Sequence, residues 1–354
     1  MPELPEVETV RRGLNDVTLH QTIEGGDVLL DRTIAHPFSV PDFLTGLQGT
    51  AIVQWHRRGK YLLAELQKAE GRLRRERSVE QRQEADFGVS AQSNKDRSDA
   101  NKIVAFPYRP IAASPSATYS TSHSLLPTPH SSLPHPSPLT PRLSWLGVHL
   151  RMTGQLLWLD QTEPLEKHTR VRLFFGAGKE LRFVDQRTFG QMWWVPPEHE
   201  PEQIITGLQQ LGPEPFSEEF SVPYFTQKLQ RRRPIKNALL DQSIVAGIGN
   251  IYADEALFLS GIHPQTLCID LKPSQIERLR SNIVQVLQAS IEAKGTTFRT
   301  FRSVAGVNGN YGGSAWVYGR DGDVCRNCAT AIERLRMAGR SAHFCPTCQR
   351  LKKG

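Results

Sequence analysis

The spacing of hydrophobic residues changes character along this 354-residue chain. Val7, Val10 and Leu14 recur at helical spacing, which predicts one helix close to the start. From there to about residue 195, short runs rich in hydrophobic residues are separated by Gly and Asp, as in an antiparallel sheet packed on a core. The runs that predict strands are 51–55, 61–66, 146–152, 155–158, 170–175, 180–184 and 191–195.

After Pro196 the pattern becomes helical. It predicts a short helix over 237–244, a tight Gly-rich turn over 246–250 and a second helix over 251–259 with Asn250 as its N-cap. Ser274 and Glu277 have capping-box spacing and predict the start of a third helix. The residues expected on the buried face of that helix are Ile276, Leu279, Ile283, Leu287 and Ile291.

A segment of different composition, about residues 69–143, interrupts the strand pattern. Its first part is rich in arginine, and nine of the 24 prolines in the chain fall between Pro107 and Pro141. Such a composition buries too little apolar surface to offset the entropy lost on ordering. We expect a disordered loop between two neighbouring strands, acting as a solvated tether rather than as a basic surface that binds a polyanion.

Length and charge limit the possible classes of protein. The chain has room for two or three modest domains, and its net charge of +7 favours a polyanionic partner such as nucleic acid. No run approaches the roughly 20 apolar residues of a membrane span, and the acidic N-terminus has no apolar signal core. We therefore expect no membrane partner and a cytoplasmic location.

Four of the five cysteines form two C-x-x-C pairs near the C-terminus, and this spacing is typical of a structural zinc site. A redox pair would need only one such motif. Four thiolates close the coordination shell, so we expect one structural Zn²⁺ and no zinc catalysis. The predicted ligands are Cys325, Cys328, Cys345 and Cys348. Arg334, Arg336 and Arg340 lie between the pairs and predict a basic tip, whereas Cys268 is expected to be a packing residue.

The N-terminal segment carries candidate covalent chemistry. Pro2 is small enough for Met1 to be removed, which would leave a secondary amine as the N-terminus. An α-amino group has a pKa of about 8, so a useful fraction is neutral and nucleophilic near neutral pH, and an amine can attack a carbonyl-like carbon. Glu3 and Glu6 place carboxylates close by. The alternative is an ordinary acidic helix start, with Pro5 in the first turn.

Three further sites have ordinary alternatives. The Gly247-Ile248-Gly249-Asn250 turn could capture phosphate at a helix N-terminus or could be a simple helical hairpin. Lys60, in a turn between strands, could be solvated. The loop with Arg187 and Phe189 could be a plain turn, although a loop of this kind would fill the gap that a flipped nucleotide leaves in DNA.

Together these motifs identify a family resemblance. The segments 2–9, 57–61 and 247–252 and the four-cysteine motif resemble bacterial formamidopyrimidine-DNA glycosylase through nearly the whole chain except the 69–143 insert. The resemblance implies a multidomain α+β protein. It would have an N-terminal β-sandwich with a flanking helix (1–200), a helix–two-turn–helix domain (213–300) and a C-terminal zinc ribbon (315–354).

The resemblance also implies a function and residue roles. The protein would be a bifunctional DNA glycosylase and AP lyase in base excision repair. As a monomer associated with the bacterial nucleoid, it would act on double-stranded DNA that contains oxidised purines or abasic sites. Pro2 would attack the sugar C1′, with Glu3 as the acid that opens the sugar ring. Lys60 would assist β-elimination and Arg340 δ-elimination of the strand.

The implied contacts with DNA are spread along the chain. Glu6 would help hold the lesion pocket, and the loop over 296–313 would close over the flipped base. The residues that would fill the gap in the duplex are Met152, Arg187 and Phe189. The residues that would contact the DNA backbone are His168, Lys236, Asn250 and one arginine among 231–233, taken here as Arg232.

Two rival interpretations differ in chemistry. The related endonuclease VIII type prefers oxidised pyrimidines, but it usually has glycine where this chain has Leu4, and the Arg187/Phe189 pair also favours the purine enzyme. A noncatalytic zinc-ribbon DNA-binding protein would explain the charge and the cysteines but not the N-terminal segment.

Overall fold

A computed structural model describes residues 2–69, 143–295, 304 and 311–351. The predicted disordered segment, apart from its ends, and most of the 296–313 loop lie outside these residues. Within the described ranges, none of the helices combines the length and the apolar character that a membrane crossing requires.

The helix near the N-terminus forms as predicted. Helix α1 (Leu4–Thr18) has Glu3 as its N-cap residue and a proline in its first turn, and it buries Val7, Val10 and Leu14. It packs on strand β3 (Thr50–Arg58), where the indole of Trp55 donates a 2.9 Å hydrogen bond to the Thr18 hydroxyl.

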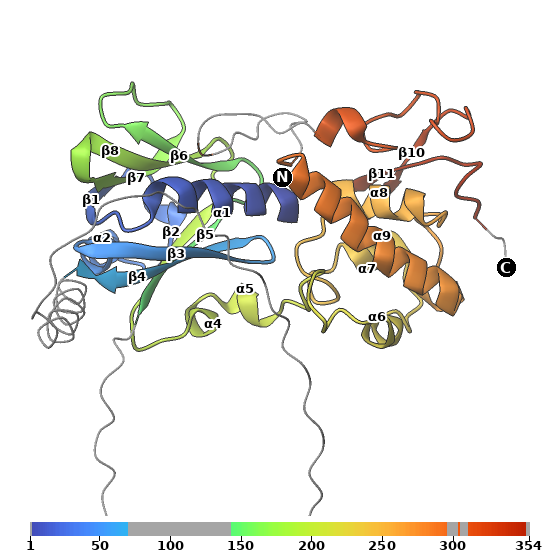
Figure 1. Cartoon of the computed structure of the whole chain (residues 1–354), viewed down its shortest axis with the longest axis horizontal. Coiled ribbons are helices and arrows are strands. Elements are labelled where there is room, and N and C mark those ends of the chain that lie inside the picture. The colour runs from blue at the N-terminus through green and yellow to red at the C-terminus, as the bar shows by residue number, and fades with distance from the viewer. Residues whose placement is uncertain (1, 70–142, 296–303, 305–310, 352–354) are drawn as a thin grey trace, which may run out of the picture. The chain divides into compact units, whose positions relative to one another are not determined.

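Two sheets, each built mainly of antiparallel strands, form the N-terminal β-sandwich (Figure 1). One is the four-stranded sheet β1-β7-β8-β6, and the other is the five-stranded sheet β2-β9-β5-β4-β3, in which only β2 and β9 run parallel. The remaining bounds are β1 (Ile23–Val28), β2 (Ile34–His36), β4 (Tyr61–Lys68), β5 (Ser144–His149), β6 (Gly154–Asp160), β7 (Thr169–Phe175), β8 (Lys179–Asp185) and β9 (Gln191–Val195). A single core joins buried side chains of both sheets and α1, such as Leu62, Val171 and Val10.

The predicted strands all occur, but β1, β2 and helix α2 (Val40–Leu47) were not anticipated. β1 carries two glycines and two acidic residues among six, and β2 has only three residues, so neither has a clear hydrophobic pattern. Strands β4 and β5 pair directly, with Leu66 opposite Ser144, so the segment between them connects adjacent strands as expected. Lys60 follows Gly59, which has a φ of +56°, in the tight turn from β3 to β4.

The helical part follows β9 and contains short helices before the two main ones. Their bounds are α4 (Pro201–Ile204), α5 (Thr206–Gln209), α6 (Val222–Lys228), α7 (Ile235–Leu239), α8 (Asn250–Leu259) and α9 (Pro273–Glu292). All five residues expected on the inner face of α9 are buried. In Figure 1 the N-terminal end of α1 faces α8 and α9.

Three predicted helix starts were wrong. The helix expected over 237–244 is α7, which begins and ends earlier. The N-cap of α8 is Gly249, and Asn250 is its first residue. Helix α9 begins at Pro273 after Lys272, whose backbone N–H donates to Gln275, so the Ser274–Glu277 capping box does not form. For α9 the chain thus satisfies the helix end with a different partner from the one expected.

The C-terminal part is a small ribbon. Strands β10 (Glu333–Met337) and β11 (Arg340–Phe344) form an antiparallel hairpin. Phe258 of α8 packs with Val317 and Ile332 beside the cysteines, which gives the ribbon a small core attached to the helical part. The multidomain α+β fold with sandwich, helical part and ribbon is confirmed.

Candidate active site

The N-terminal segment docks on the start of α8. Leu4 N–H donates to the Gly247 carbonyl at 3.0 Å. The Glu3 carboxylate accepts hydrogen bonds from the backbone N–H groups of Ile251 at 3.0 Å and Tyr252 at 3.4 Å. The N-terminus of α8 thus binds an acidic group, as the sequence suggested, but that group is a side-chain carboxyl of the same chain rather than a phosphate.

Glycines in the 247–250 turn make this approach possible. A Cβ atom at Gly249 would lie 2.2 Å from the carboxyl carbon of Glu3, and one at Gly247 would lie 2.6 Å from Leu4 Cδ1. Gly247 also has a φ of +88°, in the left-handed region that favours glycine. The turn is therefore shaped to receive residues 3 and 4, which the hairpin interpretation does not explain.

A second carboxylate supports the first. Glu6 accepts a 2.8 Å hydrogen bond from the Glu3 backbone N–H and a 2.6 Å hydrogen bond from the Tyr252 hydroxyl. The same hydroxyl lies 2.6 Å from the Ser290 hydroxyl of α9. Burial, followed by the charge of Glu6, raises the pKa of Tyr252 well above its usual value, so the phenol stays protonated and can donate.

Lys60 is a buried cation beside these acids. Its side chain is 7% exposed, and its ammonium donates a 2.8 Å hydrogen bond to the Ile248 carbonyl. Burial lowers its pKa to about 8, against the opposing influence of Glu3. Burial raises the pKa of Glu3, against the influence of Lys60. The solvated alternative for Lys60 is therefore wrong, and the site holds an acid and a base with pKa values moved toward neutrality.

The hairpin of the ribbon brings a second cation to this site. Arg340 is the first residue of β11 and is exposed, and its positive charge contributes to the lowered pKa of Lys60. Pro2, next to Glu3, is buried. Glu3, Lys60 and Arg340, which were predicted as catalytic from distant parts of the sequence, thus act on one another electrostatically beside the buried Pro2.

Helix α8 fixes the hairpin through residues that the sequence patterns did not single out. The Asp254 carboxylate accepts from Lys236 Nζ at 2.6 Å and from the His343 backbone N–H of β11 at 3.0 Å. Lys236 also donates to the Ser341 carbonyl at 2.6 Å and has no exposed surface. A contact of Lys236 with the DNA backbone would therefore require its release from Asp254.

The neighbouring Glu255 acts in the same way on the chain that enters the ribbon. Its buried carboxylate accepts hydrogen bonds of 2.7–3.0 Å from three consecutive backbone N–H groups, those of Trp316, Val317 and Tyr318. Adjacent polar residues on an otherwise hydrophobic helix are the only sequence signal for these anchors.

The residues predicted to fill a gap in DNA lie at one edge of the sandwich. Met152 belongs to the turn over 150–153 between β5 and β6, which we call the β5–β6 turn. Arg187 and Phe189 belong to the loop over 186–190 between β8 and β9, the β8–β9 loop. The Arg187 guanidinium lies 5.0 Å from the centre of the Phe189 ring, and Phe189 as a residue is 53% exposed. The His168 carbonyl accepts from the backbone N–H of Asp185, so His168 adjoins the same edge.

The four predicted zinc ligands converge. Their sulfur atoms all lie within 4.8 Å of one another, with separations of 3.4, 3.5 and 3.9 Å between three of the pairs. A tetrahedron with Zn–S bonds of about 2.3 Å has edges of about 3.8 Å. The set therefore fits one structural zinc ion. Cys268 is separate and buried, as expected, and burial raises its pKa to about 11.

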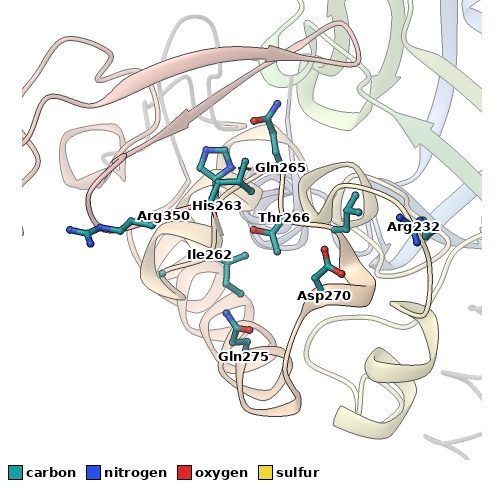
Figure 2. A pocket seen from close by; sticks show the side chains of 11 residues that line it. Arg232, Ile262, His263, Gln265, Thr266, Asp270, Gln275 and Arg350 are labelled. Atoms are coloured by element: carbon teal, nitrogen blue, oxygen red, sulfur yellow. Dashed lines mark hydrogen bonds between the residues drawn. The ribbon is translucent and has the colours of Figure 1, made fainter. Parts of the chain in front are cut away.

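A cavity of about 530 Å³ lies elsewhere, between the chain that follows α8, the start of α9 and the C-terminal residues 350 and 351 (Figure 2). Arg232 and Arg350 are at its two sides, and Arg232 is the only residue lining it that was predicted to contact DNA. The residues predicted as catalytic do not line it.

Asn250 lies at the Glu3-binding end of α8, and its buried Oδ1 has no hydrogen-bond partner within the described ranges.

Protein-family comparisons cover all three parts. The model described as the formamidopyrimidine-DNA glycosylase N-terminal domain matches residues 1–80 and 139–192 and leaves most of the insert unmatched. The formamidopyrimidine-DNA glycosylase H2TH domain matches 211–302, and the zinc finger found in FPG and IleRS matches 322–351.

Individual proteins are similar over the whole chain. Formamidopyrimidine-DNA glycosylase of Nostoc punctiforme is 56% identical, covering 99% of this chain and 97% of the relative. That of Nostoc sp. PCC 7120 is 55% identical, covering 99% and 100%. Among solved structures, a Lactococcus lactis FPG mutant with Fapy-dG DNA has a TM-score of 0.73, and L. lactis Fpg with abasic-site DNA has 0.72. Both are 28% identical and cover 99% of this chain and 100% of theirs.

Proposed function

The chain belongs to the formamidopyrimidine-DNA glycosylase family of DNA-repair enzymes, and we propose that it excises oxidised purines from double-stranded DNA and then cleaves the strand. The similar solved structures include complexes with DNA that contains Fapy-dG, an abasic site or carbocyclic 8-oxo-G. DNA carrying such lesions is therefore the proposed partner of this chain, which we expect to act as a monomer.

The first proposed step is covalent. After removal of Met1, the Pro2 nitrogen attacks the C1′ atom of the damaged nucleotide, and the bond from C1′ to the base breaks. The base leaves with the bonding electrons and takes up a proton. The nitrogen then loses its proton as a C1′=N⁺ iminium forms, and O4′ leaves C1′.

Glu3 is the proposed proton donor to O4′. A carboxyl group serves as an acid near neutral pH only when its pKa is raised, and burial raises that of Glu3. The N–H groups of Ile251 and Tyr252 orient the carboxyl group, while Glu6 accepts from its backbone.

The proposed strand cleavage follows from the iminium. It acidifies the C2′ proton, and loss of that proton breaks the C3′–O bond. A second elimination breaks the C5′–O bond and leaves phosphate at both ends of the gap. Lys60 and Arg340 are the proposed cations that stabilise the leaving phosphates, and a Lys60 pKa of about 8 also suits proton transfer.

Backbone and gap contacts complete the proposal. Met152, Arg187 and Phe189 would occupy the space left by the flipped nucleotide, with Arg187 facing the orphaned cytosine. His168, Asn250 and Arg232 would contact backbone phosphates.

The single observation that carries this proposal is the buried Glu3–Lys60 pair next to Pro2. Both residues hydrogen-bond to the 247–252 segment, which lies 188 residues or more further along the chain. A noncatalytic DNA-binding protein has no use for such a pair, because burying both charges costs stability without adding a DNA contact.

Borohydride trapping tests the covalent step. The reagent reduces an iminium to a stable amine, so the wild-type protein should become linked to duplexes containing 8-oxoguanine. Pro2→Gly should weaken this trapping strongly, and intact-mass measurement should show that Met1 is absent from the trapped protein. Normal nicking by protein that retains Met1 would refute the mechanism.

A substrate panel separates the rivals. Excision of 8-oxoguanine and formamidopyrimidines ahead of oxidised pyrimidines supports the proposal, and the reverse order supports the endonuclease VIII type. An oxidised-pyrimidine duplex belongs in the panel because one of the similar L. lactis complexes contains such DNA. Binding to all duplexes with no trapped adduct and no base release would support the binding-protein rival.

A further inference from the structure

Both loops predicted to fill the gap in DNA leave the sandwich at one buried carboxylate. We propose that Asp185 is a positioning residue that holds the β5–β6 turn and the β8–β9 loop in one fixed arrangement and thereby sets the preference for the base opposite the lesion. This inference rests on the proposed function, because it concerns how the enzyme fills the gap after the damaged nucleotide has left the duplex.

Asp185 lies where the two loops meet. It is the last residue of β8 and pairs with Gly154, the first residue of β6, so the β8–β9 loop begins and the β5–β6 turn ends at the same point. Only 1% of its surface is exposed. A buried carboxylate needs hydrogen-bond donors, and both loops supply them.

The two carboxylate oxygens of Asp185 accept hydrogen bonds from different residues. Oδ1 accepts from the Thr153 hydroxyl and from the Arg187 backbone N–H at 3.2 Å. Oδ2 accepts from the Gly190 backbone N–H at 2.7 Å. The Arg187 N–H also lies 2.9 Å from the Thr153 hydroxyl, so the turn and the loop are joined directly as well as through Asp185.

These bonds hold strained backbone in place. Arg151 in the turn has a φ of +52°, and Thr188 in the loop has a φ of +58°, in a region that residues with side chains seldom adopt. Gly190 closes the loop against the carboxylate, where a Cβ atom would lie 2.4 Å from the Phe183 ring and 3.1 Å from Asp185 Oδ2.

The bonded groups adjoin the three side chains that face the gap. Met152 precedes Thr153, Arg187 itself carries one of the two bonded N–H groups, and Phe189 precedes Gly190, which carries the other. The hydrogen bonds of this one carboxylate therefore fix the backbone of the turn and the loop that carry the three side chains. The Glu3 carboxyl group and the Lys60 ammonium instead hydrogen-bond to α8 and the turn before it, which separates this anchor from the proposed chemistry.

The test uses Asp185→Asn, which keeps the shape but places an NH₂ group against one of the present donors. The measured quantities are kcat/KM for 8-oxoguanine opposite cytosine and opposite adenine, and cleavage of a preformed abasic site in single-stranded DNA, where there is no gap to fill. We expect excision opposite cytosine to fall about tenfold and the cytosine-to-adenine ratio to approach one, with single-strand cleavage within about twofold of wild type.

Thr153→Val and Thr153→Ser give a matched pair in case Asp185→Asn folds poorly. The valine variant removes the hydroxyl that joins turn and loop, and the serine variant keeps it. We expect the cytosine-to-adenine ratio of kcat/KM to fall in Thr153→Val and to be restored in Thr153→Ser. The two variants should have equal melting temperatures and equal rates of single-strand cleavage. An unchanged ratio in Thr153→Val, or an unchanged ratio in well-folded Asp185→Asn, would overturn the inference. Absence of lesion excision by the wild-type protein would instead refute the proposed function.

Discussion

Replacement of Lys60 by methionine should stabilise the fold at neutral pH while abolishing the proposed strand cleavage. Burial lowers the pKa of Lys60 from 10.5 to about 8. At about 1.4 kcal/mol for each pH unit, keeping this lysine charged costs the folded state about 3 kcal/mol. Methionine has a similar unbranched length and removes that cost.

The cost depends on pH in a defined direction. Below pH 8 the lysine is protonated in both the folded and unfolded chain, so the full cost is present. Between about pH 8 and 10.5 the folded chain gives up the proton while the unfolded chain retains it, so wild-type stability rises with pH. Above 10.5 both states are neutral, and the difference between wild type and variant should disappear.

One neighbour of Lys60 leaves this gain in stability unchanged, and a second reduces it. The Ile248 carbonyl keeps a 2.8 Å hydrogen bond from Gln242 when Lys60 is replaced, so no acceptor is orphaned there. Glu3 loses a nearby positive charge, which raises its pKa further and disfavours its ionised form. A net stabilisation of about 1–2 kcal/mol at pH 7 remains.

Thermal or urea unfolding of wild type and Lys60→Met from pH 6.5 to 11 measures this difference. Lys167→Met, at an exposed lysine, is the control and should give no pH-dependent difference. The reasoning is refuted if Lys60→Met is less stable than wild type at pH 7, or if any stabilisation is the same at every pH.

Two further changes follow from the geometry of the site. Gly249→Ala would place a methyl group 2.2 Å from the Glu3 carboxyl carbon, so base excision should fall about a hundredfold. The control is Gly25→Ala, where the added methyl would have no neighbouring atom within 4 Å. Full activity of Gly249→Ala would contradict the docking of Glu3. Removal of zinc by a chelator should disorder the hairpin that carries Arg340, so the reaction should proceed through β-elimination but not through δ-elimination. The end groups of the DNA product on a gel distinguish the two outcomes. A product with phosphate at both ends from zinc-free protein would contradict the role given to the ribbon.

The sequence predicted the local features of this protein better than its contacts. The strands flanking the insert, the inner face of α9 and the four cysteines follow from spacing alone, because periodicity and ligand geometry are local properties. Lys60 shows that contacts between distant parts of the chain could not be predicted in this way. Its turn was predicted, but its burial depends on the Ile248 carbonyl, 188 residues away.

The starts of helices also depend on contacts between distant parts of the chain, which local sequence preferences do not predict. Asn250 is a good N-cap by type, yet the first N–H groups of α8 are satisfied by Glu3 from the other end of the chain. A capping preference of about 1 kcal/mol is small beside this tertiary arrangement. Asp185 and Asp254 could not be singled out either, because an acidic residue at a strand end or on a helix is usually solvated.

Helix α8 shows why buried charge occurs in this fold. Its N-terminus holds Glu3, and its own Asp254 and Glu255 hold the hairpin and the chain entering the ribbon. Hydrophobic packing could supply comparable stability, since burying carboxylates carries a desolvation cost. Hydrogen bonds, unlike apolar contacts, require particular atoms at particular angles. Two carboxylates of this short helix and the Glu3 carboxyl group bound at its N-terminus therefore fix Glu3 and the hairpin of Arg340 to a common support. The proposed reaction, in which both residues act on one nucleotide, requires such a support.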